Sequence, residues 1–173
     1  MNKGGRRHTL VVVPCGKAKI WDRQPEAGAT PARDAYVGTP FKLNRQYAER
    51  VGDAWFVLSA KYGLLHPDDP VDGPYDVTFT RRGSGPIESE AIRAQALTLG
   101  VDSYERVIGL GGAEYRRVVK AAFDGLGPRL EFPFGGTPLG KALRATKLAT
   151  EQGRVKASTE PAESLSTAHR KMP

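Results

Sequence analysis

TLVVV, the stretch Thr9–Val13, decides the fold, because an uninterrupted apolar and β-branched run of this length is typical of a strand buried on both faces. Two similar runs follow it, WFVL at Trp55–Leu58 and RVIGL at Arg106–Leu110. LEFPF at Leu130–Phe134 predicts a short fourth strand. Pro133 within it favours a position at the edge of the sheet, since proline donates no hydrogen bond to a neighbouring strand.

Helical patterns alternate with these runs, and the signals at their ends are clear. Thr39-Pro40 is typical of a helix start, and the apolar spacing of Tyr115–Phe123 is typical of a helix that faces a core. The expected helices lie over about 39–52, 86–99, 115–123 and from 137 onward. Strands alternating with helices predict an α/β protein, a single-domain three-layer α/β/α sandwich with a short, mostly parallel four-stranded sheet.

The distribution of charge divides the chain into three parts. The chain of 173 residues has a net charge of +7, but residues 1–23 carry about +5 and residues 141–173 about +4, while the middle is slightly acidic. We therefore expect a flexible basic arm at 1–8, the α/β domain at 9–150 and a disordered tail at 151–173. Basic ends of this kind either bind phosphate backbones or remain solvated.

Composition excludes several classes of protein. One cysteine allows no disulfide within the chain, and three scattered histidines have no metal-ligand spacing, so we expect neither a metal nor a cofactor. No apolar run approaches the roughly 20 residues of a membrane span, and the start of the chain does not resemble a secretory signal. The expectation is a cytoplasmic protein without a membrane partner, whose oligomeric state stays open.

Glycine and lysine follow the expected strands, where a parallel sheet presents its ligand sites. Four loops begin at the strand ends: PCGK at 14–17, SAKYG at 59–63, GLGG at 109–112 and FGGT at 134–137. Glycine lets backbone N–H groups approach a ligand, and lysine supplies positive charge for an anion. None of the loops is a GxxxxGK[ST] or a complete GxGxxG motif, so we do not expect a P-loop NTPase or an ordinary dinucleotide enzyme but a different phosphate or nucleotide site.

Particular side chains are assigned roles at this edge. Lys19 and Lys61 would hold phosphate, and Asp34 or Asp76 would act as the acid/base or bind a sugar hydroxyl. Ser59 would donate a hydrogen bond or act as a nucleophile. The expected catalytic residues are Asp34, Asp76, Ser59 and Lys61. The expected ligand-binding residues are Cys15, Gly16, Lys19, Tyr36, Tyr62, Gly111, Gly112 and Tyr115, with a base stacked on Tyr36 or Tyr62.

A second group of basic residues could contact nucleic acid. On the last expected helix, the spacing of the basic residues predicts a stripe on one face, and two arginines precede the first strand. The residues of this group are Arg6, Arg7, Lys141, Arg144 and Lys147.

Four motifs resemble those of one family. VPCGxxK at 13–19, ARDAYVGTPF at 32–41, SAKYGLLxP at 59–67 and PYD at 74–76 are similar to a bacterial and phage domain of unknown function labelled YaaA-like or peroxide-stress-protein-like. PxGGxPLGKAL at 133–143 resembles the end of that family. The resemblance covers about 11–144 and carries an association with DNA binding and oxidative stress.

A weaker resemblance concerns the first of these loops. Pro14-Cys15-x3-Lys19 is similar to the Pro-Cys-x3-Lys-Pro-Tyr motif of tRNA-modifying enzymes of the archaeosine-synthase type, which act on a 7-deazaguanine base. Here Ile20-Trp21 replace Pro-Tyr, and the serine and histidine that follow in that family are absent. The resemblance implies a base-binding loop. The loop layout is also analogous to that of base-excising glycosylases.

Three functions are consistent with these patterns. The first is an enzyme that acts on a nucleobase, nucleotide or nucleic acid, by base modification or glycosidic-bond chemistry. The second is a non-catalytic nucleic-acid-binding protein of stress or phage biology, motivated by the basic ends. The third is a nucleotide sensor or a partner-binding module, which would bind a nucleotide without turning it over.

Overall fold

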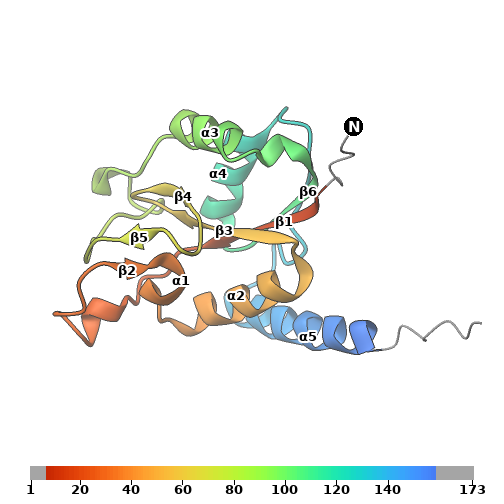
Figure 1. Ribbon diagram of the computed structural model, residues 1–173, viewed down its shortest axis with the longest axis horizontal. Coiled ribbons are helices and arrows are strands. Elements are labelled where there is room, and N and C mark those ends of the chain that lie inside the picture. Colours follow the sequence, from red (N-terminus) through yellow and green to blue (C-terminus); the bar gives the residue numbers. More distant parts are fainter. Residues whose placement is uncertain (1–6, 159–173) are drawn as a thin grey trace, which may run out of the picture.

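The computed structural model describes residues 7–158, and a five-stranded sheet lies at its centre (Figure 1). The strands of this sheet are β1 (Arg7–Pro14), β3 (Ala54–Ser59), β4 (Gly63–Leu65), β6 (Tyr104–Gly109) and β7 (Arg129–Glu131). A separate antiparallel pair consists of β2 (Thr30–Pro31) and β5 (Pro70–Val71). The α-helices are α1 (Ala32–Ala35), α2 (Thr39–Val51), α3 (Ser89–Thr98), α4 (Ala113–Phe123) and α5 (Leu139–Ser158), and short 3-10 turns are η1 (Ile20–Asp22), η2 (Arg82–Ser84) and η3 (Val101–Ser103).

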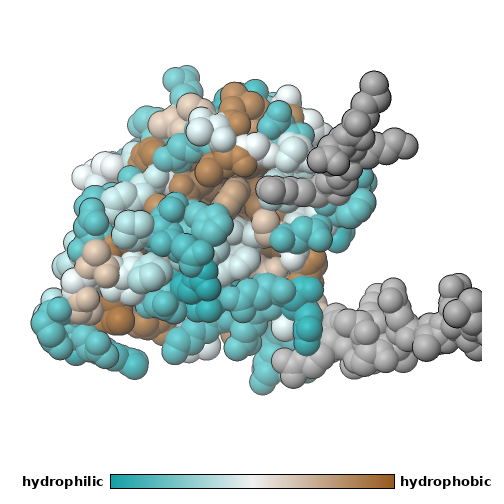
Figure 2. All heavy atoms as spheres, in the orientation of Figure 1, coloured by the Kyte–Doolittle hydropathy of each residue, from teal (hydrophilic) through white to brown (hydrophobic). Residues whose placement is uncertain are grey.

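The α/β sandwich predicted from the sequence is confirmed. β1 is the central strand because its side chains are buried on both faces from Thr9 to Pro14. One buried cluster lies between the sheet and the pair α3–α4, and the other lies between the sheet and α1, α2 and α5 (Figure 1). On the face shown in Figure 2, hydrophilic side chains gather in the lower half over α2, and apolar surface lies in the upper half around α3 and α4.

The sheet has one strand more than the four predicted. β4 pairs antiparallel with β3 through Val57–Leu65 and Ser59–Gly63, and the other neighbouring pairs are parallel. The three residues of β4 directly follow a tight turn, and the sequence pattern predicts no strand there. Gly63 makes the turn possible, because its φ of 76° suits glycine and a Cβ there would lie 2.1 Å from Gln95 Oε1.

The outer edge of β4 is covered by a side chain instead of another strand. Gln95 of α3 accepts a hydrogen bond from the Leu64 N–H at 2.9 Å and donates one to the Tyr62 carbonyl at 2.8 Å. The amide therefore satisfies both backbone groups as a neighbouring strand would.

The strand order reverses direction at β1. The order is β4-β3-β1-β6-β7, so the chain builds one half of the sheet outward from β1 and then crosses to its other side. In open α/β sheets, ligands bind outside the carboxyl ends of the strands beside such a reversal. Gly111 keeps the loops after β1 and β6 close, because its φ is 106° and a Cβ there would lie 2.9 Å from Pro14 Cγ.

Several boundaries differ from the sequence-based expectation. α3 begins at Ser89 instead of about 86, because Ile87 N–H first donates to the Ala60 carbonyl. β7 lies at the edge of the sheet, as predicted, although Pro133 falls beyond its end. α5 continues to Ser158, into the expected tail. The rest of that tail and residues 1–6 of the expected arm lie outside the described residues.

Candidate functional site

Lys19 is a buried cation in the loop after β1. Its side chain is 7% exposed, and its Nζ donates to the Lys17 carbonyl at 3.2 Å. Its backbone is fixed by a bridge to Tyr36 and by a hydrogen bond to Asp22. Within residues 7–158 no carboxylate forms an ion pair with Nζ. An ammonium group has three donors, so Lys19 has unused hydrogen-bonding capacity and an uncompensated charge.

Tyr75 connects Lys19 to the loop after β3. The Lys19 Nζ lies 4.4 Å from the centroid of the Tyr75 ring, and the Lys61 Nζ lies 5.6 Å from the same centroid. Tyr62 packs edge-on against this ring, with centroids 5.6 Å apart. Two lysines that are distant in the sequence therefore meet on one aromatic surface, which attracts cations through its ring electrons.

A chain of hydroxyl groups holds Tyr75 in place. Its OH lies 2.6 Å from the Tyr36 OH and 2.9 Å from Ser59 Oγ. Ser59 Oγ already accepts the N–H groups of Lys61 and Tyr62, each at 3.2 Å, which favours donation of the serine proton to Tyr75. Ser59 is fully buried. We therefore assign it to positioning Tyr75 and the β3–β4 turn, and not to nucleophilic attack.

Burial keeps the tyrosine hydroxyls of this region protonated. It raises the pKa of Tyr36, Tyr75 and Tyr115 well above the usual value for tyrosine, and an electrostatic interaction with nearby Cys15 raises each pKa further. The Cys15 Sγ lies 3.3 Å from the Tyr115 OH. This contact joins the loop after β1 to α4.

A cavity of about 530 Å³ opens beside these groups. Its wall combines the loop after β1, the loop before η2 and the first turn of α4. The lining residues are Cys15, Gly16, Lys17, Lys19, Asp76, Val77, Thr78, Thr80, Arg81 and Tyr115. Asp76 is 87% exposed and pairs with Arg81 at 2.9 Å. The cavity thus offers three cations and one accessible carboxylate to a ligand.

Five of the predicted catalytic and ligand-binding residues come together at this cavity. Cys15, Gly16, Lys19, Asp76 and Tyr115 line the cavity. Lys61 and Tyr62 are joined to it through the Tyr75 ring.

Three of the predicted ligand contacts are placed elsewhere. Tyr36 is 2% exposed and packs against Phe41, so its ring is closed to a stacked base. Gly111 and Gly112 line a separate pocket.

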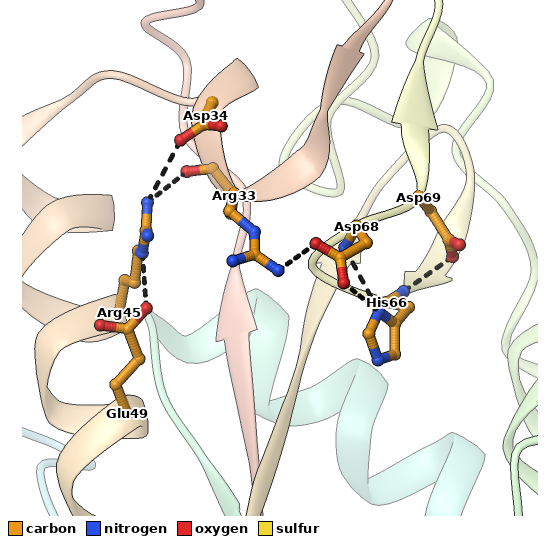
Figure 3. A network of polar contacts seen from close by, with 7 residues as sticks. All are labelled: Arg33, Asp34, Arg45, Glu49, His66, Asp68 and Asp69. Atoms are coloured by element: carbon orange, nitrogen blue, oxygen red, sulfur yellow. Dashed lines mark hydrogen bonds and ion pairs between the residues drawn. The ribbon is translucent and has the colours of Figure 1, made fainter.

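Asp34 lies in a surface network away from this cavity (Figure 3). Arg45 is the centre of one half of the network. It lies 3.6 Å from Asp34 and 2.8 Å from Glu49, and it donates to the Arg33 carbonyl. Arg33 in turn pairs with Asp68. The carboxylate of Asp34 is neutralised by an arginine there, which argues against its assignment as the acid/base.

The other half of this network holds the start of the long loop after β4 (Figure 3). Asp69 accepts the backbone N–H of His66 at 2.8 Å, and His66 Nδ1 accepts the N–H of Asp68. These bonds shape the turn that leads into β5, so the side chains have a structural role.

Tyr75, Lys17 and Arg81 belong to the site but were not among its predicted residues. The length of the loop over 66–85 and the PYD motif at 74–76 were the available signals. They indicated a functional loop without showing which side chain faces the ligand, because that depends on contacts with Ser59 and Lys19.

The predicted nucleic-acid residues lie apart from the cavity. Lys141, Arg144 and Lys147 are exposed along α5, and no ion pair neutralises them within the described part of the chain. Arg7 begins β1, and Arg6 lies outside the described residues. Among residues 7–158 no cluster of His, Cys, Asp and Glu could hold a metal ion, and no helix is long and apolar enough to cross a membrane.

Comparisons with known proteins point to one group. Residues 10–147 match a family described as "Family of unknown function (DUF6884)". The chain is also similar to "Uncharacterized protein YfjM" of Bacillus subtilis (strain 168), with 38% identity over 144 residues that cover 83% of this chain and 95% of that protein. No solved structure matches the chain.

Proposed function

The chain belongs to the family DUF6884, and from this premise we propose that it is an enzyme acting on a nucleobase, a nucleotide or a nucleic acid. The observation that carries the proposal is the buried, uncompensated ammonium of Lys19 at the wall of a cavity. A buried charge without a counter-ion is costly, and an anionic ligand would remove that cost. Phosphate is the anion that suits the neighbouring cations best.

The proposed phosphate contacts come from three cations. Lys19 provides a fixed charge, while Lys17 and Arg81 line the same cavity from two different loops. Arg81 forms an ion pair with Asp76, and a bound phosphate would compete for the guanidinium and release the carboxylate. Phosphate binding would thereby free the Asp76 carboxylate to act as the acid/base.

Asp76 is the proposed acid/base. In hydrolysis of an N-glycosidic bond, its carboxylate would take a proton from water while the water oxygen bonds to the anomeric carbon. The electron pair of the C–N bond would leave with the base, which takes up the proton. The high exposure of Asp76 suits exchange of that proton, and Tyr115 and Cys15 would donate hydrogen bonds to the base or sugar.

The two motif resemblances described in the sequence are consistent with this proposal. A base-binding loop like that of archaeosine-synthase-type enzymes would correspond to Cys15 and Lys19, and a YaaA-like assignment would place the activity near DNA and oxidative stress in the cytoplasm. Both are proposals that rest on the motifs at 13–19 and 59–67.

A second candidate function is nucleic-acid binding without catalysis. It is favoured by the exposed stripe of Lys141, Arg144 and Lys147 on α5. Binding to this stripe would weaken steeply with salt, because each phosphate contact releases counterions. A nucleotide sensor, the third candidate, would bind nucleotide in the cavity and return it unchanged.

The test compares ligands with and without phosphate. Isothermal titration calorimetry of the four ribonucleoside monophosphates and their nucleosides is expected to show binding that needs the phosphate. Lys19→Met should weaken it by about 10- to 100-fold, the range for a hydrogen bond to a charged group. Lys42→Met, at an exposed position of α2, should change it less than twofold.

Turnover separates the enzyme from the sensor. Chromatography of the nucleotide after incubation with the protein is expected to show a released or altered base. Asp76→Asn should abolish this product while leaving binding within a few-fold. Binding without any product would favour the sensor, and phosphate-independent binding would contradict the role of Lys19.

A further inference from the structure

A second pocket, of about 360 Å³, is separate from the Lys19 cavity. Its wall is formed by α2, the start of α4, the β7–α5 connection and the start of α5. It shares no lining residue with the Lys19 cavity. The proposed function does not use Asn44 or Arg116, which contribute polar groups to this wall.

Asn44 is the polar residue of α2 at this pocket. Its side chain is 7% exposed, and its amide makes no hydrogen bond with any residue of the described chain. Buried amides in native proteins nearly always have partners, because an unpaired one loses its hydration without compensation. An amide that has no protein partner and lines a pocket is therefore free to bind a ligand group.

The starts of two helices add partial positive charge to the pocket. α4 begins here after Gly112, where no side chain caps the helix, and space around the Gly112 Cα is open. α5 also begins here, and Ala142 N–H donates to the Pro138 carbonyl in its first turn. The start of a helix carries partial positive charge and free N–H groups, which bind anions.

Arg116 adds a full positive charge to these partial charges. It lines the pocket from the first turns of α4 and forms no ion pair with the described residues. No carboxylate lines the pocket. The remaining wall is mainly apolar, with Phe134, Leu139 and Leu143 as its largest side chains. A ligand that fits both features has a compact oxyanion attached to an apolar or ring-shaped group.

We propose that this pocket binds the phosphate group of a small organic phosphate monoester, with Asn44, Arg116 and the starts of α4 and α5 as the phosphate contacts. Phosphate suits the pocket because a dianion uses donors from several directions at once. The apolar wall holds the organic group, so inorganic phosphate alone binds more weakly. The site stands independently of the Lys19 cavity and of any catalytic role.

The test uses phenyl phosphate, which has a ring and a phosphate but neither ribose nor base. Calorimetric titration is expected to show binding at least tenfold tighter than that of inorganic phosphate, and none for phenol. Asn44→Leu and Arg116→Gln should each weaken binding at least tenfold. Arg117→Gln, on the exposed side of α4 where it pairs with Glu114, should change it less than twofold.

Two controls keep the result interpretable. Thermal unfolding checks that Asn44→Leu is folded, and a Tm equal to or above that of the native protein is expected because an unpaired amide is removed. Lys19→Met should leave phenyl phosphate binding unchanged. The proposal is overturned if phenyl phosphate does not bind at millimolar concentration, if both pocket variants bind normally, or if Lys19→Met alone removes binding.

Discussion

Lys19 and Arg45 are both partly or fully buried cations, yet their surroundings differ. Arg45 lies between Asp34 and Glu49 and also donates to a carbonyl (Figure 3). Lys19 has one carbonyl and the face of an aromatic ring but no carboxylate. The difference teaches that a cation paired with carboxylates maintains the fold, whereas a cation without a carboxylate partner is available to an anionic ligand.

The largest effect on stability is expected when the support behind Lys19 is broken. Tyr75→Phe removes the hydroxyl that joins Tyr36 to Ser59, and both of these buried groups lose a partner. The free energy of unfolding should fall by about 1–3 kcal/mol, as for other buried polar groups left unpaired. Urea denaturation measures this change. An unchanged midpoint would show that the hydroxyl chain contributes nothing to the fold.

Tyr62→Phe is the matched control for that experiment. Tyr62 packs against the same ring, but its hydroxyl makes no hydrogen bond with the described residues. Its removal should change the free energy of unfolding by less than about 0.5 kcal/mol, as for other substitutions away from buried partners.

A substitution of Lys19 should change the free energy of unfolding in the opposite direction to Tyr75→Phe. Lys19→Met keeps the length of the side chain but removes its uncompensated charge. The free energy of unfolding is expected to rise by about 1 kcal/mol, the common gain when a group retained for function is replaced by an apolar one. Differential scanning calorimetry without ligand measures it. A marked loss of stability would mean that the ammonium maintains the fold, as Arg45 does.

The ion pairs of Arg45 should contribute less. Asp34→Asn removes a partner that is half exposed and 3.6 Å away. A loss of less than about 1 kcal/mol is expected, because exposed ion pairs are screened by water and salt. Unfolding at low and high salt measures it, and the difference between variant and native protein should shrink as salt rises. A larger loss that is insensitive to salt would contradict the surface character of this network.

The smallest effect concerns an exposed pair at the far end of β1. His8 hydrogen-bonds Glu105 at 3.0 Å, and this contact raises the pKa of the imidazole above 6.5. Because the raised pKa belongs to the folded state, the pair stabilises the protein below pH 6.5 and loses its effect as the pH rises through the higher value. A titration of the imidazole by NMR should show this pKa, and Glu105→Gln should lower it towards 6.5.

The strands could be predicted from the sequence because burial on both faces leaves an unbroken apolar run, as in Val11–Val13. The position of Lys19 at the cavity agrees with the rule that parallel strands present ligand sites at their carboxyl edge, whereas Asp76 comes from a loop that follows no parallel strand. β4 could not be predicted in this way. Its three residues are too few to show an alternation of apolar and polar side chains, and their pairing with β3 depends on the turn at Gly63.

The partners of individual side chains were beyond reach of the sequence. Nothing in the sequence distinguishes the role of Asp34 from that of Asp76. Only the packing of α1 against α2 places Arg45 beside Asp34. Likewise, the motif around Tyr75 indicated a loop of interest, but its contact with Ser59 joins residues 16 positions apart through a turn that the residue pattern does not encode.

The amide of Gln95 limits association between copies of this protein through the edge of the sheet. It occupies the backbone groups of Leu64 and Tyr62 that an extended segment of a second molecule would otherwise pair with. Exposed strand edges promote self-association and fibre growth, and natural sheets protect them. One side chain here blocks intermolecular strand addition at the β4 border, so the sheet remains finite without a further strand.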